Sequence, residues 1–147
     1  MSSAAATRMT RQQASTALAE GVDQDLAAAA DILALLERQF EAALRHQSAQ
    51  LALLAEQLPP ALDAMDARRL QRVALVRALL GMEGTMAGFI AAQPESSRAP
   101  LAAAWSELER VVLACKAATL RNGNLLADQF TTMQRVLQGG DGTYAPR

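Results

Sequence analysis

The stretch Leu101–Leu137, LAAAWSELERVVLACKAATLRNGNLLADQFTTMQRVL, carries the longest heptad pattern in the chain. Interleaved residues recurring every seven positions are typical of the a and d positions of a helix that packs on other helices. As one α-helix the stretch would be roughly 55 Å long at about 1.5 Å per residue, more than a compact core needs. We therefore expect part of this seam to face a partner. The first series is Leu101, Leu108, Cys115, Asn122, Gln129 and Val136, and the second is Trp105, Val112, Thr119, Leu126 and Met133.

The middle of the seam contains the dipeptide Asn122-Gly123, which allows two interpretations. Asn-Gly is a strong signal for a tight turn, and this would give a helix-turn-helix. However, the helical period continues in the same phase on both sides of the dipeptide, from Leu108 to Val136. This continuity favours a single helix with a polar interruption.

The composition predicts an all-α fold in a single domain. Half of the 147 residues are apolar, and only five are aromatic. Alanine and leucine dominate the apolar set, as is typical of helices. The expected architecture is an elongated antiparallel bundle of three long helices.

Charge and apolar patterning exclude several classes of function. The chain has 14 basic and 15 acidic residues, without the basic block that would neutralise a row of phosphates, so nucleic-acid binding is disfavoured. There is no secretory signal and no run of about 18 apolar residues, so we expect no membrane insertion. The single Cys115 fits a buried position and a reducing, cytoplasmic compartment.

Proline, glycine and capping signals divide the chain into three helices. Thr10 and Gln13 form a capping-box pattern at the first start, Pro59-Pro60 breaks the chain, and Gly139-Gly140 offers a C-cap at the end. The predicted helices are 11–58, 62–92 and 100–138, and the predicted disordered ends are 1–9 and 139–147.

Two features of the second helix leave alternatives open. Its four arginines indicate either a phosphate site or, as we favour, a solvated face that pairs with acidic neighbours. Its three glycines share one face of a helix and indicate either close helix approach or a loosened helix. The residues are Arg68, Arg69, Arg72 and Arg77, and Gly81, Gly84 and Gly88.

The sequence offers little chemistry, and we expect no enzyme, no metal and no cofactor. The only histidine, His46, lies on a predicted helix, without a second ligand at a workable spacing for a metal. A phosphotransfer domain would expose such a histidine, but these domains usually carry a basic residue three positions later, where this chain has Ala49. What remains is a binding module or, as the alternative, a structural coiled-coil protein that associates with itself.

The third helix resembles the FlgN-type flagellar export chaperones. That family typically shows an Asn-x-x-Asn-Gly-x-Leu-Leu/Ile core, a further dozen helical residues ending in leucine, and a tyrosine in a polar tail. The order and spacing match in Leu120–Leu126, Leu137 and Thr143-Tyr144. One position departs, because Thr119 stands where the family has its first asparagine.

The resemblance implies a cytoplasmic chaperone for the hook–filament junction proteins. Its cargo would be the disordered C-terminal segments of those proteins, which fold as amphipathic helices against the chaperone. Delivery to the type III export apparatus would involve the export gate and its ATPase, with Tyr144 as the contact to the gate. The cargo site expected on the third helix comprises Asn122, Gly123, Leu125, Leu126, Phe130, Met133 and Leu137; the alternative is that these residues pack only on the first two helices.

Overall fold

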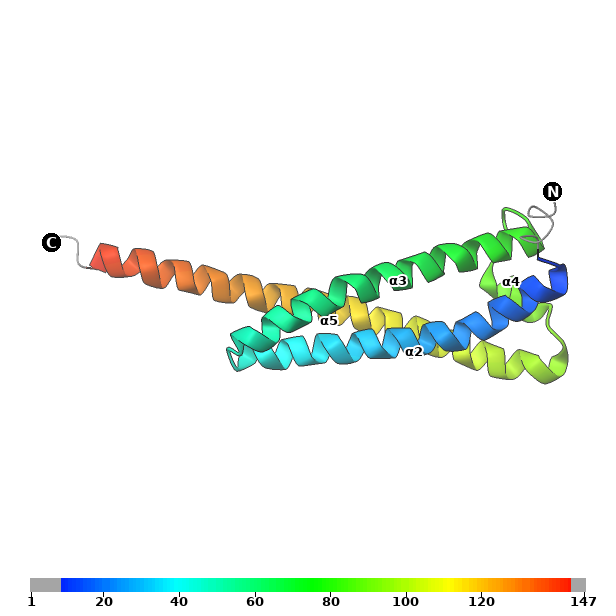
Figure 1. The fold of residues 1–147 in the computed structure, drawn as a ribbon, viewed down its shortest axis with the longest axis horizontal. Coiled ribbons are helices and arrows are strands. Elements are labelled where there is room, and N and C mark those ends of the chain that lie inside the picture. The colour runs from blue at the N-terminus through cyan, green and yellow to red at the C-terminus, as the bar shows by residue number, and fades with distance from the viewer. Residues whose placement is uncertain (1–8, 144–147) are drawn as a thin grey trace.

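The fold is all-α, as the composition predicts. A computed structural model describes the backbone of residues 9–143 and the side chains of residues 9–139. Three long helices form an elongated antiparallel arrangement, and one short helix that the sequence did not predict joins the second to the third (Figure 1). The helices are α2 (Arg11–Leu44), α3 (Ser48–Leu80), α4 (Met86–Ala91) and α5 (Glu95–Thr143).

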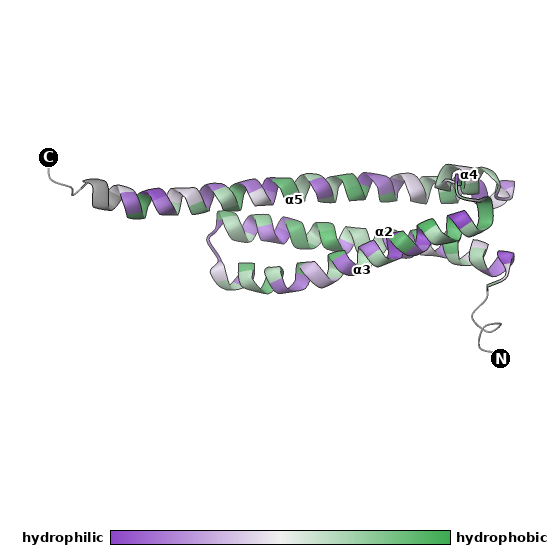
Figure 2. Cartoon of the chain, turned by 90° about the horizontal axis from the view of Figure 1, so that it is seen from above, coloured by the Kyte–Doolittle hydropathy of each residue, from purple (hydrophilic) through white to green (hydrophobic). Residues whose placement is uncertain are grey.

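Helix α2 lies between the other two long helices and packs against both. It packs closely along α3 and along α5, whereas no Cα atoms of the described parts of α3 and α5 come within 8 Å of each other. Seen from above, α2 lies between α3 and α5 near the turn that joins α2 to α3 (Figure 2). The centre of the core is correspondingly supplied by α2, whose fully buried side chains include Leu18, Val22 and Ile32.

The first helix ends at Leu44, so the predicted helix 11–58 is wrong. The chain reverses at His46, which has a left-handed φ of 54°. The backbone N–H of Gln47 bonds to the Ala42 carbonyl at 2.9 Å, and that of His46 bonds to the Ala43 carbonyl at 3.2 Å. This is the Schellman pattern of a helix C-terminus, formed here without glycine or asparagine. The start of the helix is as predicted, because Thr10 and Gln13 form the capping box.

The Pro59-Pro60 break is also wrong, because α3 runs through both prolines. Each proline removes one hydrogen bond to the carbonyl four residues earlier, at Ala55 and Glu56. Both prolines and both of these residues are exposed, so water can satisfy the freed carbonyls. Leu54 and Leu58 are buried on the opposite side of the helix, and this packing keeps the segment helical.

The second long helix ends at Leu80 instead of residue 92. Gly81 ends it with a φ of 91°, which side-chain-bearing residues rarely adopt. A Cβ atom at Gly84 would lie 2.7 Å from the Leu80 Cβ, so this glycine permits close approach of the turn. Thr85 then caps α4 by accepting a hydrogen bond from the Gly88 N–H at 3.0 Å. Gly81 and Gly84 therefore lie in the connection between α3 and α4, Gly88 lies in α4, and the three do not share one helical face.

Helix α5 extends beyond both predicted ends, 100 and 138. It begins after Pro94, whose carbonyl accepts bonds from Ser97 and Arg98, and Pro100 lies inside it. The helix continues through Gly139-Gly140 to Thr143, because glycine permits a left-handed cap but does not impose one. Residues 139–143 of the predicted disordered tail are thus helical, and residues 1–8 and 144–147 lie outside the described residues.

The seam of α5 differs from the predicted one in its second series. Leu101, Leu108, Cys115 and Asn122 are buried as expected. Their companions against α2 are Val111 and Ala118, one position before the predicted Val112 and Thr119. The row of Trp105 and Val112 is half-buried on the side of α3, where Val112 lines a cavity of about 230 Å³ together with Leu62 and Met65.

The arginines of α3 mostly pair with acidic neighbours, as predicted, but Arg68 and Arg72 do so at a buried carboxylate and not on a solvated face. Asp25 of α2 is 6% exposed and pairs with both Arg68 and Arg72, the latter at 2.8 Å. Arg72 also lies over the Trp105 ring, with its guanidinium carbon 5.1 Å from the ring centroid. Arg69 pairs with Asp66 at the surface. This buried charge cluster fixes the position of α3 against α2. Arg68 and Arg72 are both used in contacts within the protein.

Candidate functional site

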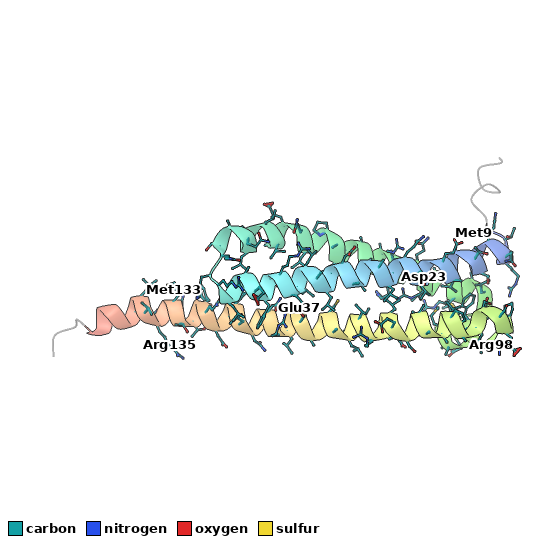
Figure 3. The ribbon with its side chains drawn as sticks, turned by 90° about the horizontal axis from the view of Figure 1, so that it is seen from below. Met9, Asp23, Glu37, Arg98, Met133 and Arg135 are labelled. Carbon is teal, nitrogen blue, oxygen red and sulfur yellow. The ribbon has the colours of Figure 1, made fainter. Side chains whose placement is uncertain are left out.

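The most distinctive surface is the end of α5 that projects beyond the other helices. The side-chain amide of Gln129 donates a hydrogen bond to the Ala43 carbonyl at 2.9 Å, close to the end of α2. Met133 and Arg135 lie beyond the ends of α2 and α3 (Figure 3). We call residues 130–143 the overhang; these 14 residues span roughly 21 Å at about 1.5 Å per residue.

The overhang presents large apolar side chains to solvent. Every residue from Phe130 to Gly139 is exposed. Four large apolar side chains within it are 60–64% exposed, in a segment that is helical throughout. Leu125 and Leu126, at its root, are half-buried. The four are Phe130, Met133, Val136 and Leu137, three of which recur at helical spacing and can together receive the apolar face of another helix.

Asn122 belongs to the interior of the bundle. It is 1% exposed, and its amide donates hydrogen bonds of 2.8 Å to the Leu36 carbonyl and to Oε1 of Gln39. Its own oxygen accepts a bond from Nε of Arg121 at 3.1 Å. The amide N–H groups are therefore used across to α2, the oxygen is bonded to Arg121 of α5 itself, and in this conformation the side chain cannot touch a cargo.

A polar clasp surrounds Asn122 where α5 leaves the bundle. Arg121 lies over the Phe40 ring, 3.9 Å from its centroid, and pairs with Glu37 at 3.0 Å. We define the clasp as Arg121, Asn122 and Gln129 of α5 with the residues of α2 that they contact. Because its contacts are directional hydrogen bonds and charges, it sets the register from which the overhang projects.

Gly123 has an ordinary helical backbone and free space around it. The structure has a continuous helix here, so the helix-turn-helix alternative is excluded. A Cβ atom built on Gly123 would meet nothing within 4 Å. The packing of this chain alone therefore gives no reason for a glycine at this position.

Of the remaining candidate residues, Cys115 is buried and His46 lies in a turn. Cys115 is 7% exposed, its thiol lies 3.5 Å from the Ala29 carbonyl, and burial raises its pKa. His46 lies in the turn between α2 and α3, so the expectation that it lies on a helix is wrong. Tyr144 lies outside the described residues.

Metal-ligand clusters and membrane-crossing helices are both absent from the described part of the chain. No group of three histidine, cysteine, aspartate or glutamate side chains is placed to hold a metal ion among these residues. None of the helices described combines the length and the apolar character needed to cross a membrane.

Sequence reasoning missed most of the clasp. Gln129 was assigned to the seam, but Arg121 and Gln39 carried no signal, because isolated polar residues on a helix normally face solvent. The available clue was spacing: Asn122 and Gln129 are seven residues apart in the first heptad series of the seam, which is otherwise apolar. Two amides at this spacing face the same neighbouring helix, where they can meet carbonyl groups.

Comparison with known protein families gives a match over most of the chain. The family model described as "FlgN protein" matches residues 9–139, which include α2, α3, most of α5 and the exposed apolar side chains of the overhang. Searches of curated proteins and of solved structures find no significant match. The chain therefore belongs to the FlgN family of flagellar chaperones.

Proposed function

We propose that this protein binds the C-terminal segments of flagellar hook–filament junction proteins and delivers them to the type III export apparatus. The overhang of α5 carries the proposal, because it is a helix with large exposed apolar side chains and without a neighbouring helix of its own. Such a surface on a cytoplasmic protein is a liability unless a partner covers it. Membership of a flagellar chaperone family makes an export cargo the partner that fits best.

In this proposal the cargo segment folds as it binds. A disordered segment with apolar residues three and four positions apart would form a helix along Leu126, Phe130, Met133 and Leu137. The bound helix would bury those side chains together with its own apolar face. Covering the segment would prevent premature assembly of the cargo. Asn122 and Gly123, assigned by the resemblance to the cargo site, would contribute through the position and flexibility of the helix.

The cargo site is tested by calorimetric titration with peptides from the C-termini of junction proteins. We expect submicromolar, one-to-one binding to the intact chain. Met133→Asp should abolish this binding, because a charge on the apolar surface would have to be desolvated when the peptide covers it.

The matched control for that titration is Met82→Asp. Met82 is 75% exposed against 60% for Met133, and it lies in the connection between α3 and α4. This control should bind like the unmodified chain, and circular dichroism should show both variants folded. Equal affinity of the two variants would rule out the overhang as the cargo site.

We further propose that Tyr144 contacts the export gate after the cargo is bound. A tyrosine offers a large amphipathic contact area at low entropic cost, which suits transient docking. Tyr144→Ala should leave peptide affinity unchanged and reduce export of junction proteins, measured as their amount in the culture medium. Loss of peptide binding in this variant would contradict the separation of the two roles.

A further inference from the structure

A second line of exposed apolar residues runs along α5, and it starts well before the overhang. Leu113, Leu120, Phe130 and Leu137 are each 64–67% exposed. Counted in heptads, Leu113, Leu120, Ala127 and Gln134 take one core position, and Lys116, Gly123, Phe130 and Leu137 take the other. We call these eight residues the outer stripe. All eight are exposed, so this stripe is separate from the seam that packs on α2.

The outer stripe is symmetric about residue 125. Consider a second α5 that lies antiparallel to the first, with residue 125 of one helix opposite residue 125 of the other. Each residue then faces the residue of the second helix for which the two residue numbers add up to 250. Large residues then meet large ones, and small residues meet at the centre. The pairs are Leu113 with Leu137, Leu120 with Phe130, Gly123 with Ala127, and Lys116 with Gln134, each occurring twice because of the two-fold axis.

Gly123 fits the centre of such a pair. A helical glycine costs about 1 kcal/mol relative to alanine, and no residue in the described part of the chain fills the space beside Gly123. Beside Ala127 of a second helix, the missing side chain would allow the two backbones to approach closely. The same contact would give the flanking Leu120 and Phe130 room to interlock.

Charges do not oppose this arrangement. Between Leu113 and Leu137 the charged residues outside the outer stripe are Arg121, Asp128 and Arg135. Each directly follows a core position in the heptad, which turns it away from a second helix. Lys116 would face the neutral Gln134. Like charges therefore do not meet across the two-fold axis.

We propose that the free protein forms an antiparallel homodimer through the outer stripe. Eight large apolar side chains would be covered, giving an area on the order of 1,000 Å², near the lower limit for specific interfaces. A contact of this size fits a reversible dimer. Phe130 and Leu137 belong to both the outer stripe and the overhang, so dimerisation would compete with cargo. That competition rests on the proposed function, whereas the dimer does not.

The dimer is tested by sedimentation equilibrium of the full chain from about 1 to 200 µM. We expect a reversible monomer–dimer equilibrium that Leu120→Asp weakens by roughly tenfold or more, or about 1.4 kcal/mol or more. Leu70→Asp is the matched control, since Leu70 is 54% exposed on α3 and should leave the equilibrium unchanged. A chain that stays monomeric throughout, or a dimer that is insensitive to Leu120→Asp, would overturn the proposal.

A second variant, Gly123→Leu, distinguishes a specifically weakened dimer from a misfolded chain. Gly123→Leu has free space in the monomer and replaces a poor helix former with a good one, so it should raise the melting temperature of the monomer. The same change should weaken the dimer, because the added side chain blocks the close approach. Weakened dimerisation together with raised thermal stability supports the proposal; a dimer of undiminished affinity overturns it.

Adding a junction-protein peptide to the dimer separates this inference from the proposed function. Dissociation into one-to-one complexes is expected. A monomeric chain that binds the peptide would overturn the dimer and leave the proposed function standing. A dimer that binds no peptide would support the dimer and contradict the proposed function. A dimer that binds peptide without dissociating would overturn the competition.

Discussion

Asn122 shows how one residue connects the sequence motif to the geometry of the molecule. Its amide crosses from α5 to α2, where it meets a main-chain carbonyl and the side chain of Gln39. An apolar residue of similar size would tolerate several registers at this position, whereas the amide is satisfied in one. The part of the motif that resembles the FlgN family thus sets where the overhang begins.

Replacing Asn122 should destabilise the fold, and replacing its neighbour should not. Asn122→Ala removes a buried amide with three hydrogen bonds, so we expect a loss of about 1–3 kcal/mol in the free energy of unfolding. Asn124 is exposed, and Asn124→Ala should stay within about 0.5 kcal/mol. Urea denaturation followed by circular dichroism measures both. Equal effects of the two changes would contradict a structural role for Asn122.

Among the elements, α3 departs most from what the sequence predicts. A pair of prolines normally marks a helix boundary, yet here the boundary is a left-handed histidine thirteen residues earlier. The decisive difference is tertiary: the buried Leu54 and Leu58 hold the segment on the bundle, while Ala55 and Glu56, whose carbonyls lose their hydrogen bonds, are exposed. Sequence patterns reflect the local free-energy cost of a proline in a helix, but they do not include the tertiary packing that offsets it here.

The prolines should carry a measurable cost. Pro59→Ala restores one backbone hydrogen bond, and an interior proline costs about 3 kcal/mol relative to alanine. A more flexible unfolded chain offsets about 0.4–1 kcal/mol of the gain. We expect a net stabilisation of about 2 kcal/mol in urea denaturation, against a change within about 0.5 kcal/mol for Pro94→Ala, just before the start of α5. A fall in stability for Pro59→Ala would mean that the fold requires a bend at the prolines.

Helix α5 was predicted more accurately than α3, and the error in its predicted seam has a physical cause. The heptad phase across Asn122-Gly123 correctly indicated one helix. The predicted second row of the seam lies one position too late, because Trp105 and Thr119 are larger than Ala104 and Ala118, the residues one position earlier. Ala118 packs on α2 because it is small and lets the helices approach closely. Apolar periodicity identifies the buried face of a helix. Choosing the larger apolar residues as the core positions can, however, select the wrong edge of that face.

At the scale of the whole molecule, the arrangement separates stability from binding. Helix α2 buries its side chains against two neighbours that do not pack closely on each other. Helix α5, with 49 residues, would be roughly 73 Å long at about 1.5 Å per residue, against roughly 51 Å for the 34 residues of α2. The difference in length leaves the overhang outside the core. A partner could therefore cover or leave this end while the bundle stays folded.

The overhang should also be the least protected part of the long helices in the free protein. A helical end without tertiary contacts frays, because short helices are marginal in water. A cargo helix packed against it would stabilise its backbone hydrogen bonds. We therefore predict a change in amide exchange that is confined to one end of one helix.

The measurement that tests this most directly is hydrogen exchange of the full chain, with and without a C-terminal peptide from a junction protein, read out by mass spectrometry. We predict fast exchange in residues 130–139 of the free protein at a concentration where it is monomeric, and strong protection of residues 126–139 on binding. Exchange in the middle of α2 should change little. Protection confined to α2 and α3, with the overhang still exchanging freely, would contradict the assignment of cargo to the overhang.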